Sequence, residues 1–269
     1  MSQPRVVAIV QARMGSSRLP GKVLADIAEE PMLVRVVERT RRAKTVHEVV
    51  VATTTDKADQ PIAELCDRRG YRWTRGHPTD VLDRYYQAAR EFSADVIVRL
   101  TADCPLIDPA LIDEVVQAFL STDPPVDFAA NRIPGDRTYP IGLDTEVCSF
   151  QALETAWRNA DQPYQREHVM PYLYEVPGRF RVLHLRHEPD LGSLRWAVDT
   201  AQDLELIRQV FARFNGRDDF TWQEVLALIA HEPELTQINA DVRHKTYTDV
   251  DERLSSGTLS ETPSAGGRS

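Results

Sequence analysis

The chain has 269 residues, of which 42% are hydrophobic and 27% are charged, as in folded globular proteins rather than disordered ones. Its 41 acidic residues outnumber its 32 Lys and Arg, and the formal net charge of -9 argues against a broad nucleic-acid-binding surface, which needs clustered positive charge. No apolar run approaches the roughly 18 residues of a membrane span, so we expect neither nucleic acid nor membrane as a partner.

Cysteine usage and the N-terminal residues indicate the compartment. Cys66, Cys104 and Cys148 are odd in number and form no CxxC spacing, so we expect reduced thiols rather than disulfides or a zinc site. The apolar run at residues 6–10 is too short for a signal peptide. The sequence therefore predicts a cytoplasmic protein.

The first 125 residues alternate between predicted strands and helices. Buried or amphipathic patterns predict strands at 6–10, 47–54, 71–74 and 95–101, and helices at 32–43, 57–69, 79–92 and 109–120. Strand–loop–helix–strand units form parallel sheets with right-handed crossovers. This part therefore predicts a three-layer, doubly wound α/β domain.

The pattern changes beyond residue 125. Strands are predicted at 126–130, 144–149, 180–186 and 194–198, with a turn-rich stretch at 131–142. Helices are predicted at 150–159, 164–174 and 221–239, and another is capped by Asp199 and Thr200 and runs to Phe214. The tail at 255–269 has 11 Ser, Gly, Thr or Pro among its 15 residues, a composition typical of disorder.

A glycine- and arginine-rich loop at residues 11–22 follows the first predicted strand, at the edge where α/β sheets bind ligands. Exposed N–H groups in such a loop bind anions, and together with its cations and serines they suit a triphosphate. It is not a Walker A loop, because five residues separate its glycines and Val23 replaces the magnesium-binding hydroxyl. The alternative is a solvated basic loop. The residues concerned are Arg13, Gly15, Ser16, Ser17, Arg18, Gly21 and Lys22.

The stretch VAIVQARMGSSRLPGKVL resembles the opening of the cytidylyltransferases that activate acidic sugars, such as 3-deoxy-manno-octulosonate and acylneuraminate cytidylyltransferases. The spore coat polysaccharide biosynthesis branch is the most similar. The resemblance continues to about Phe214 through VVVATTTD, RGHPTDVLDRYYQAA, VRLTADCPLIDP, YPIGLDTEV, REHVMPYLY and LRWAVDTAQDLELI. It implies an α/β fold, a GT-A-like nucleotidyltransferase three-layer sandwich with a mixed, mostly parallel sheet. It also implies Mg²⁺-dependent CMP transfer from CTP to an acidic sugar or related acceptor, releasing pyrophosphate, in polysaccharide biosynthesis.

Asp103 and Asp199 each follow a predicted strand and should face the same crevice as the loop. Each could instead cap a turn or helix, although Asp108 is a better cap than Asp103 for the helix that starts at Pro109. Mg²⁺ needs hard oxygen ligands, and the resemblance implies that these two aspartates supply them. Ala102 departs from the branch, which often has glycine there.

The resemblance also assigns further roles at the site. It implies catalytic roles for Arg13, Arg18, Lys22 and Asp103. It implies nucleotide contacts from Ala12, Gly15, Ser16, Ser17, Thr53, Thr54, Gly76, Asp80, Val81 and Thr101. Ordinary turn and cap chemistry is the alternative for the threonines and for Asp80.

The acceptor side is less determined. A carboxylate- or phosphate-bearing acceptor needs hydrogen-bond donors, and the candidates cluster after residue 130. Alternatively, Glu146 and Glu167 are ion-pair partners of Arg137 and Arg166, and His168 is a core or interface residue. The candidate acceptor residues are Asn131, Gly142, Asp144, Glu146, His168 and Arg195.

Three other functions stay open on the sequence alone. A transferase for another nucleoside triphosphate would share the fold but typically has a different loop spacing. A GT-A glycosyltransferase would normally show a DxD motif, whereas Asp103 is followed by Cys104 and Pro105. A non-catalytic nucleotide-binding protein is the third. We expect a nucleotidyltransferase domain at 1–215, with an acceptor and dimerisation region at 126–186, a helical extension at 216–250, a disordered tail at 251–269 and a possible homodimer.

Overall fold

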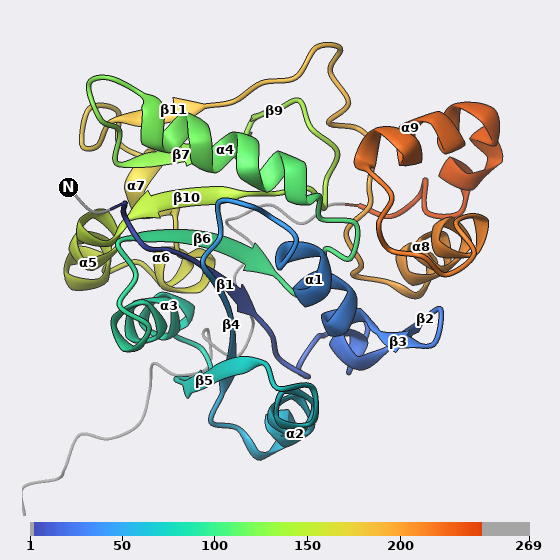
Figure 1. Cartoon of the computed structure of the whole chain (residues 1–269), viewed down its shortest axis with the longest axis horizontal. Helices are drawn as coiled ribbons and strands as arrows, with labels where there is room; N and C mark the ends of the chain where they lie inside the picture. The colour runs from blue at the N-terminus through green and yellow to red at the C-terminus, as the bar shows by residue number, and fades with distance from the viewer. Residues whose placement is uncertain (1–2, 244–269) are drawn as a thin grey trace, which may run out of the picture.

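The first strand, β1 (Val6–Gln11), lies at the centre of the sheet because its side chains are apolar on both faces. Val6, Ala8 and Val10 pack into one hydrophobic core, whereas Val7 and Ile9 pack into another. In this computed structural model, which describes residues 3–243, the sheet is therefore covered by helices on both sides (Figure 1).

The seven strands of the sheet follow the order β11-β7-β10-β6-β1-β4-β5. Strands β4 (Glu48–Thr54), β5 (Arg72–Gly76) and β6 (Val96–Thr101) run parallel to β1. Strand β10 (Glu146–Ser149) is antiparallel to β6 and to β7 (Phe128–Ala130), and β11 (Val182–His184) is parallel to β7. The predicted mixed, mostly parallel sheet is confirmed.

Two layers of helices cover the sheet. One core is formed with α1 (Met32–Thr40), α2 (Gln60–Arg69) and α4 (Pro109–Ser121), and α8 (Ala201–Arg213) and α9 (Trp222–His231) extend it at one end of the molecule (Figure 1). The opposite core is formed with α3 (Val81–Glu91), α5 (Phe150–Asn159), α6 (Pro163–His168) and α7 (Pro171–Tyr174). The carboxyl ends of β1, β4 and β6 meet at one edge, and open α/β sheets bind their ligands at this edge.

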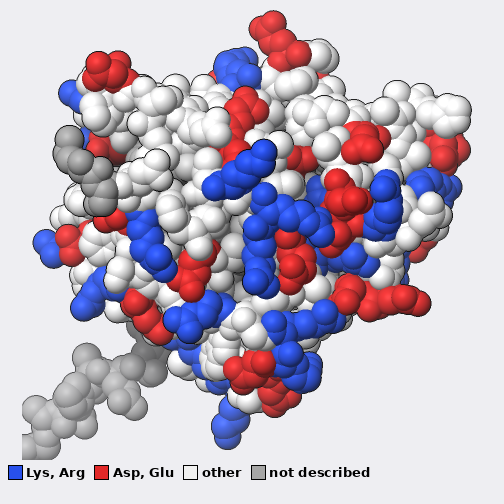
Figure 2. Space-filling view, in the orientation of Figure 1, with Lys and Arg blue, Asp and Glu red and all other residues white. Residues whose placement is uncertain are grey.

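Short hairpins and 3₁₀ turns lie outside the main sheet and the long helices. The hairpins β2–β3 (Asp26–Ile27, Glu30–Pro31) and β8–β9 (Arg132–Ile133, Asp136–Arg137) are two-stranded, and the second lies inside the stretch expected to be only turns. Three 3₁₀ turns, η1 (Lys22–Leu24), η2 (Lys57–Asp59) and η3 (Pro233–Gln237), flank longer helices or loops. In Figure 2, acidic and basic side chains interleave on the visible face.

Two predicted helices are interrupted. The helix expected at 164–174 breaks between α6 and α7, where Val169 has a left-handed backbone with φ of 71° and Pro171 starts the second segment. The helix expected at 221–239 ends at His231, because Pro233 cannot continue it, and η3 follows. Both predictions missed the effect of a proline.

The strand expected at 194–198 is also wrong. Its residues join the fold through an isolated bridge between Ile141 and Arg195 and through the bond from Val198 N to Asp103 O, 2.8 Å. The predicted tail at 255–269 lies outside the described residues. Within residues 3–243, none of the helices is long and apolar enough to cross a membrane.

Candidate active site

The phosphate loop is held in shape by its own backbone. Gly21 N donates to Met14 O at 2.9 Å, and Gly21 has a φ of 73°, a left-handed conformation that favours glycine. Met14 N donates to Asp59 at 2.6 Å, and Ala12 N donates to Ala52 O at 3.1 Å. The loop is therefore anchored to β4 and to η2 at the carboxyl edge of the sheet.

Lys22 lies at the centre of the site. Its Nζ donates to Asp103 Oδ2 and Asp199 Oδ1, both at 2.8 Å, and to Val198 O at 2.7 Å. The side chain is only 9% exposed, and burial by itself would lower the pKa of Lys22. The two carboxylates outweigh burial and raise it, so the lysine stays charged.

Asp199 receives two further cations. Arg18 Nη2 lies 2.8 Å from Asp199 Oδ2, and Arg195 Nη2 lies 2.6 Å from the same oxygen. Burial alone would raise the pKa of Asp199, but Lys22, Arg18 and Arg195 lower it well below its usual range. Three cations thus converge on one carboxylate that is 22% exposed. We call Arg18, Lys22, Asp103, Arg195 and Asp199 the Lys22 cluster.

Thr200 and Asp203, rather than Asp199, cap α8. Thr200 accepts a hydrogen bond from Asp203 N, and Asp203 accepts from the N–H groups of Asp199 and Thr200, forming a capping box. The carboxylate of Asp199 is thereby left for the Lys22 cluster. Asp108 caps α4 as expected, accepting from the N–H groups of Ala110 and Leu111.

The expected nucleotide contacts are placed around the ends of β4, β5 and β6. Gly15 and Ser17 are exposed, while Ser16 Oγ accepts from Leu19 N at 3.3 Å. Thr54 donates to Asp59, and the fully buried hydroxyl of Thr53 has no hydrogen-bond partner within the described chain. Thr101 contacts Cys104 Sγ at 3.2 Å.

Contacts within the protein explain why a glycine stands at position 76 and an aspartate at position 80, just before α3. A Cβ on Gly76 would lie 2.7 Å from Arg84 Cγ. Asp80 caps α3 by accepting from Asp83 N at 2.9 Å, and it also pairs with Arg166 of α6. Val81 next to it is buried. The structure thus gives Asp80 the alternative cap role, with an ion pair to Arg166 added.

Two acceptor candidates, Asp144 and Glu146, lie in a second charged group with Arg99, Arg132 and Arg137, and we call these five residues the Glu146 cluster. Glu146, 1% exposed, pairs with Arg99 and lies 3.6 Å from Arg132. Asp144 pairs with Arg137, with Nη2–Oδ2 at 2.9 Å. The ion pair expected between Glu146 and Arg137 is therefore replaced by these two, and Arg166 pairs with Asp80.

Asn131 and Gly142 beside this cluster are tied to the backbone. Asn131 Nδ2 donates to Leu143 O and its Oδ1 accepts from Thr145 N, both at 2.8 Å, so both ends of its amide are bonded to the backbone. Gly142 has a φ of 107°, and a Cβ there would lie 2.6 Å from Ala197 N. His168 is the last residue of α6 and is not among the residues that contact the Lys22 cluster above.

Sequence reasoning missed the support behind the Lys22 cluster. Arg195, expected as an acceptor contact, instead bonds Asp199 and, through Nε at 2.9 Å, Asp203. Asp203 stands in the V-D-T-x-x-D-L motif, so its i+4 spacing from Asp199 was a readable signal. Asn239, in the turn after η3, bonds Asp203 and Arg195 O, and no local pattern marks it.

The donor set fits a metal that also takes oxygens from substrate. Asp103 and Asp199 already share one cation, the Lys22 ammonium, and both offer hard carboxylate oxygens. Across residues 3–243, no group of three or more His, Cys, Asp or Glu forms a closed metal cage. Mg²⁺, which usually keeps waters and binds substrate phosphates with one or two carboxylates, suits such a pair. The three cysteines are free and buried, and the Cys104 Sγ lies 3.7 Å from Asp103 Oδ1.

A family model described as cytidylyltransferase matches residues 7–217, and the chain belongs to this family. It is a nucleotidyltransferase by membership. Among curated relatives, it is 37% identical over 250 residues to an uncharacterised protein of Methanocaldococcus jannaschii, covering 92% of this chain and 100% of that protein. It is 31% identical over 244 residues to the spore coat polysaccharide biosynthesis protein SpsF of Bacillus subtilis, covering 88% and 99%.

Solved structures agree with the fold. A cytidylyltransferase from Leptospira borgpetersenii superposes with a TM-score of 0.84 at 33% identity, covering 90% of this chain and 100% of that one. A CMP:2-keto-3-deoxy-manno-octonic acid synthetase complexed with CTP superposes with a TM-score of 0.58 at 23% identity, covering 78% and 99%. The second likeness supports the fold alone.

Proposed function

We propose that this chain transfers CMP from CTP to an acidic sugar or a related acceptor, with release of pyrophosphate, for polysaccharide biosynthesis. The observation that carries the proposal is the Lys22 ammonium held 2.8 Å from both Asp103 and Asp199, beside the phosphate loop. Family membership and the similarity to a spore coat polysaccharide protein support the donor and the pathway class.

Charge balance supports a divalent cation as cofactor. The Lys22 cluster brings three cations against Asp103 and Asp199, and Asp203 completes the balance through Arg195. A strongly anionic triphosphate entering alone would meet the two exposed carboxylates. Asp103 and Asp199 would hold Mg²⁺, which when bound neutralises phosphate oxygens as a Lewis acid.

The residues of the chain then position and neutralise the reactants. Arg13, Arg18 and Lys22 would bind the triphosphate oxygens, and Lys22 and Arg18 would then release the aspartates with which they pair. An acceptor oxygen attacks the α-phosphorus, and the bond to the leaving pyrophosphate breaks. The three cations stabilise the charge that builds on the pyrophosphate, so positioning and electrostatics supply most of the rate.

Pyrophosphate release tests the proposal. The full chain is incubated with Mg²⁺, each of the four nucleoside triphosphates and a panel of acceptors: octulosonates, nonulosonates, aminosugars and phosphonates. We expect release only with CTP and an acidic acceptor. A thermal shift with GTP or UTP but none with CTP would overturn the donor, and nucleotide binding without turnover on any acceptor would favour a non-catalytic role.

A further inference from the structure

The C-terminal helices reach the active site, although they lie beyond the residues that the family model matches. From Trp222 onward the chain packs against the larger core, with Val225, Ile229 and Leu235 buried there. Its last described residues then turn back along the segment that carries Arg195. We call residues 222–243 the C-terminal extension.

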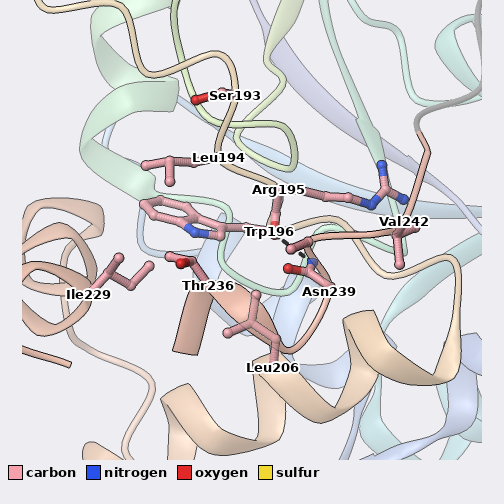
Figure 3. A pocket seen from close by; sticks show the side chains of 10 residues that line it. Ser193, Leu194, Arg195, Trp196, Leu206, Ile229, Thr236, Asn239 and Val242 are labelled. Carbon is pink, nitrogen blue, oxygen red and sulfur yellow. Dashed lines mark hydrogen bonds between the residues drawn. The ribbon is translucent and has the colours of Figure 1, made fainter. Parts of the chain in front are cut away.

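Asn239 is the point of contact. It is 6% exposed, and its Nδ2 donates to Arg195 O at 3.0 Å and to Asp203 Oδ1 at 2.9 Å. Figure 3 shows Asn239 directed at the Arg195 backbone beside Trp196, Leu206 and Thr236, while the Arg195 side chain extends away from it. One amide thus fixes both the backbone of the arginine and the carboxylate that the arginine binds.

Further hydrogen bonds connect Asp203 and Arg195 to Asp199. Asp203 accepts Arg195 Nε at 2.9 Å, and Arg195 Nη2 donates to Asp199 Oδ2 at 2.6 Å. Asp203, 1% exposed, also accepts from Asp199 N at 2.9 Å, so it fixes both the main chain and the cation partner of Asp199. Three hydrogen bonds, through Asp203 and Arg195, thereby connect Asn239 to the proposed metal-binding carboxylate.

A second contact acts on the other guanidinium at Asp199. Arg243 O accepts from Arg18 Nη1 at 3.3 Å, while Arg18 Nη2 lies 2.8 Å from Asp199 Oδ2. Arg18 and Arg195, which both bind Asp199 Oδ2, therefore each form a hydrogen bond with the C-terminal extension. Hydrophobic packing of the extension would not by itself require a polar contact to each of the two arginines that bind Asp199 Oδ2.

We propose that Asn239 is a positioning residue for Asp199, acting through Asp203 and Arg195. This rests on the function proposed above, since it gives the extension the task of orienting a metal-binding carboxylate. Groups that orient metal ligands typically change metal affinity by about 10- to 100-fold when they are removed. The extension is then part of the site rather than an accessory.

The test compares Asn239→Asp with Leu235→Ala in the full chain. Asn239→Asp keeps the shape but sets a carboxylate against Asp203, whereas Leu235→Ala removes packing from the same extension without touching the polar chain. Mn²⁺ binding is titrated by electron paramagnetic resonance with and without CTP, and CTP binding is titrated by calorimetry without metal. We expect Asn239→Asp to weaken Mn²⁺ binding about tenfold and CTP binding without metal less than twofold.

Two results would overturn the positioning role. One is Mn²⁺ binding by Asn239→Asp within twofold of the parent. The other is an equal loss in Leu235→Ala at the same melting temperature, which would assign the effect to packing. A parent chain that binds Mn²⁺ but no CTP would count against the proposed cytidylyl transfer only, because the titration without nucleotide still compares the variants. Asn239→Gln, which keeps the donor, should recover part of the affinity.

Discussion

The Lys22 cluster and the Glu146 cluster lie along the same edge of the sheet but differ in how their charges are paired. In the first, Asp103 and Asp199 remain 28% and 22% exposed and share the Lys22 ammonium. In the second, Glu146 is 1% exposed and pairs with Arg99 on the neighbouring strand. Exposed, shared pairs can be exchanged for ligand charges, whereas a buried pair mainly constrains the fold.

The pKa directions follow the same division. Lys22 and Asp199 each stay ionised because their partners outweigh burial. Burial likewise would lower the pKa of Arg99, and Glu146 reverses it. The charges of Lys22 and Asp199 are partly accessible and can be exchanged for those of an incoming anion and cation. The charges of Arg99 and Glu146 are neutralised by each other within the protein. Substitutions in the two clusters should therefore separate activity from stability.

The largest effect is expected for Lys22→Met, which keeps the length of the side chain but removes the ammonium that faces both aspartates. Loss of one charge-stabilising donor commonly costs about 10²- to 10³-fold in rate, and we expect kcat/KM to fall by that range. Pyrophosphate release with CTP and the best acceptor measures it. Lys57→Met, an exposed lysine of η2, is the control and should change kcat/KM less than twofold. A parent-like rate in Lys22→Met would remove the Lys22 cluster from the reaction.

Glu146→Gln should act on stability instead. Breaking a buried pair leaves Arg99 charged without its partner, and we expect the free energy of unfolding to fall by about 3 kcal/mol. Urea unfolding followed by circular dichroism measures it. Arg158→Gln breaks the pair with Glu154 from its exposed side, since Arg158 is 61% exposed, and should cost less than about 1 kcal/mol. A stable Glu146→Gln protein that no longer uses the acceptor would place Glu146 in acceptor binding.

Gly142→Ala tests whether close packing against Ala197, in addition to backbone strain, fixes the turn beside the Glu146 cluster. The new Cβ would lie 2.6 Å from Ala197 N, in the segment that leads to Asp199, and φ is already left-handed. Gly135→Ala is matched, because its φ is 81° and nothing lies within 4 Å of its Cβ. We expect losses of about 2 to 3 kcal/mol for Gly142→Ala against about 1 kcal/mol for Gly135→Ala, by urea unfolding. Equal losses would show that backbone strain alone matters at both turns.

The same comparison explains what the sequence could reveal. The phosphate loop and Asp103 follow β1 and β6, whose apolar runs are plain in the sequence, so the parallel part of the sheet and its edge were predictable. Asp199 meets Lys22 at the same edge without the strand that was expected to precede it. The partners of Asp199 were not, because Asn239 lies far along the chain and reaches Arg195 only through tertiary packing. The missing strand at 194–198 also depends on a tertiary contact, the bridge from Ile141 to Arg195. The break at Val169, by contrast, comes just before Pro171, a signal that the sequence does contain.

The smallest effect concerns acid stability. The pKa of Asp199 is lower in the folded chain than its ordinary value of 3.8, so its pairs add stability above about pH 4. This contribution is lost as the pH falls below that value toward the folded pKa. The advantage of the parent chain over Asp199→Asn in free energy of unfolding, measured in EDTA, should therefore shrink between pH 5 and pH 2. Gly135→Ala keeps every titrating group of the parent and should keep a constant difference from it over this range. A constant difference for Asp199→Asn would mean that Lys22, Arg18 and Arg195 leave Asp199 no more acidic than in the unfolded chain.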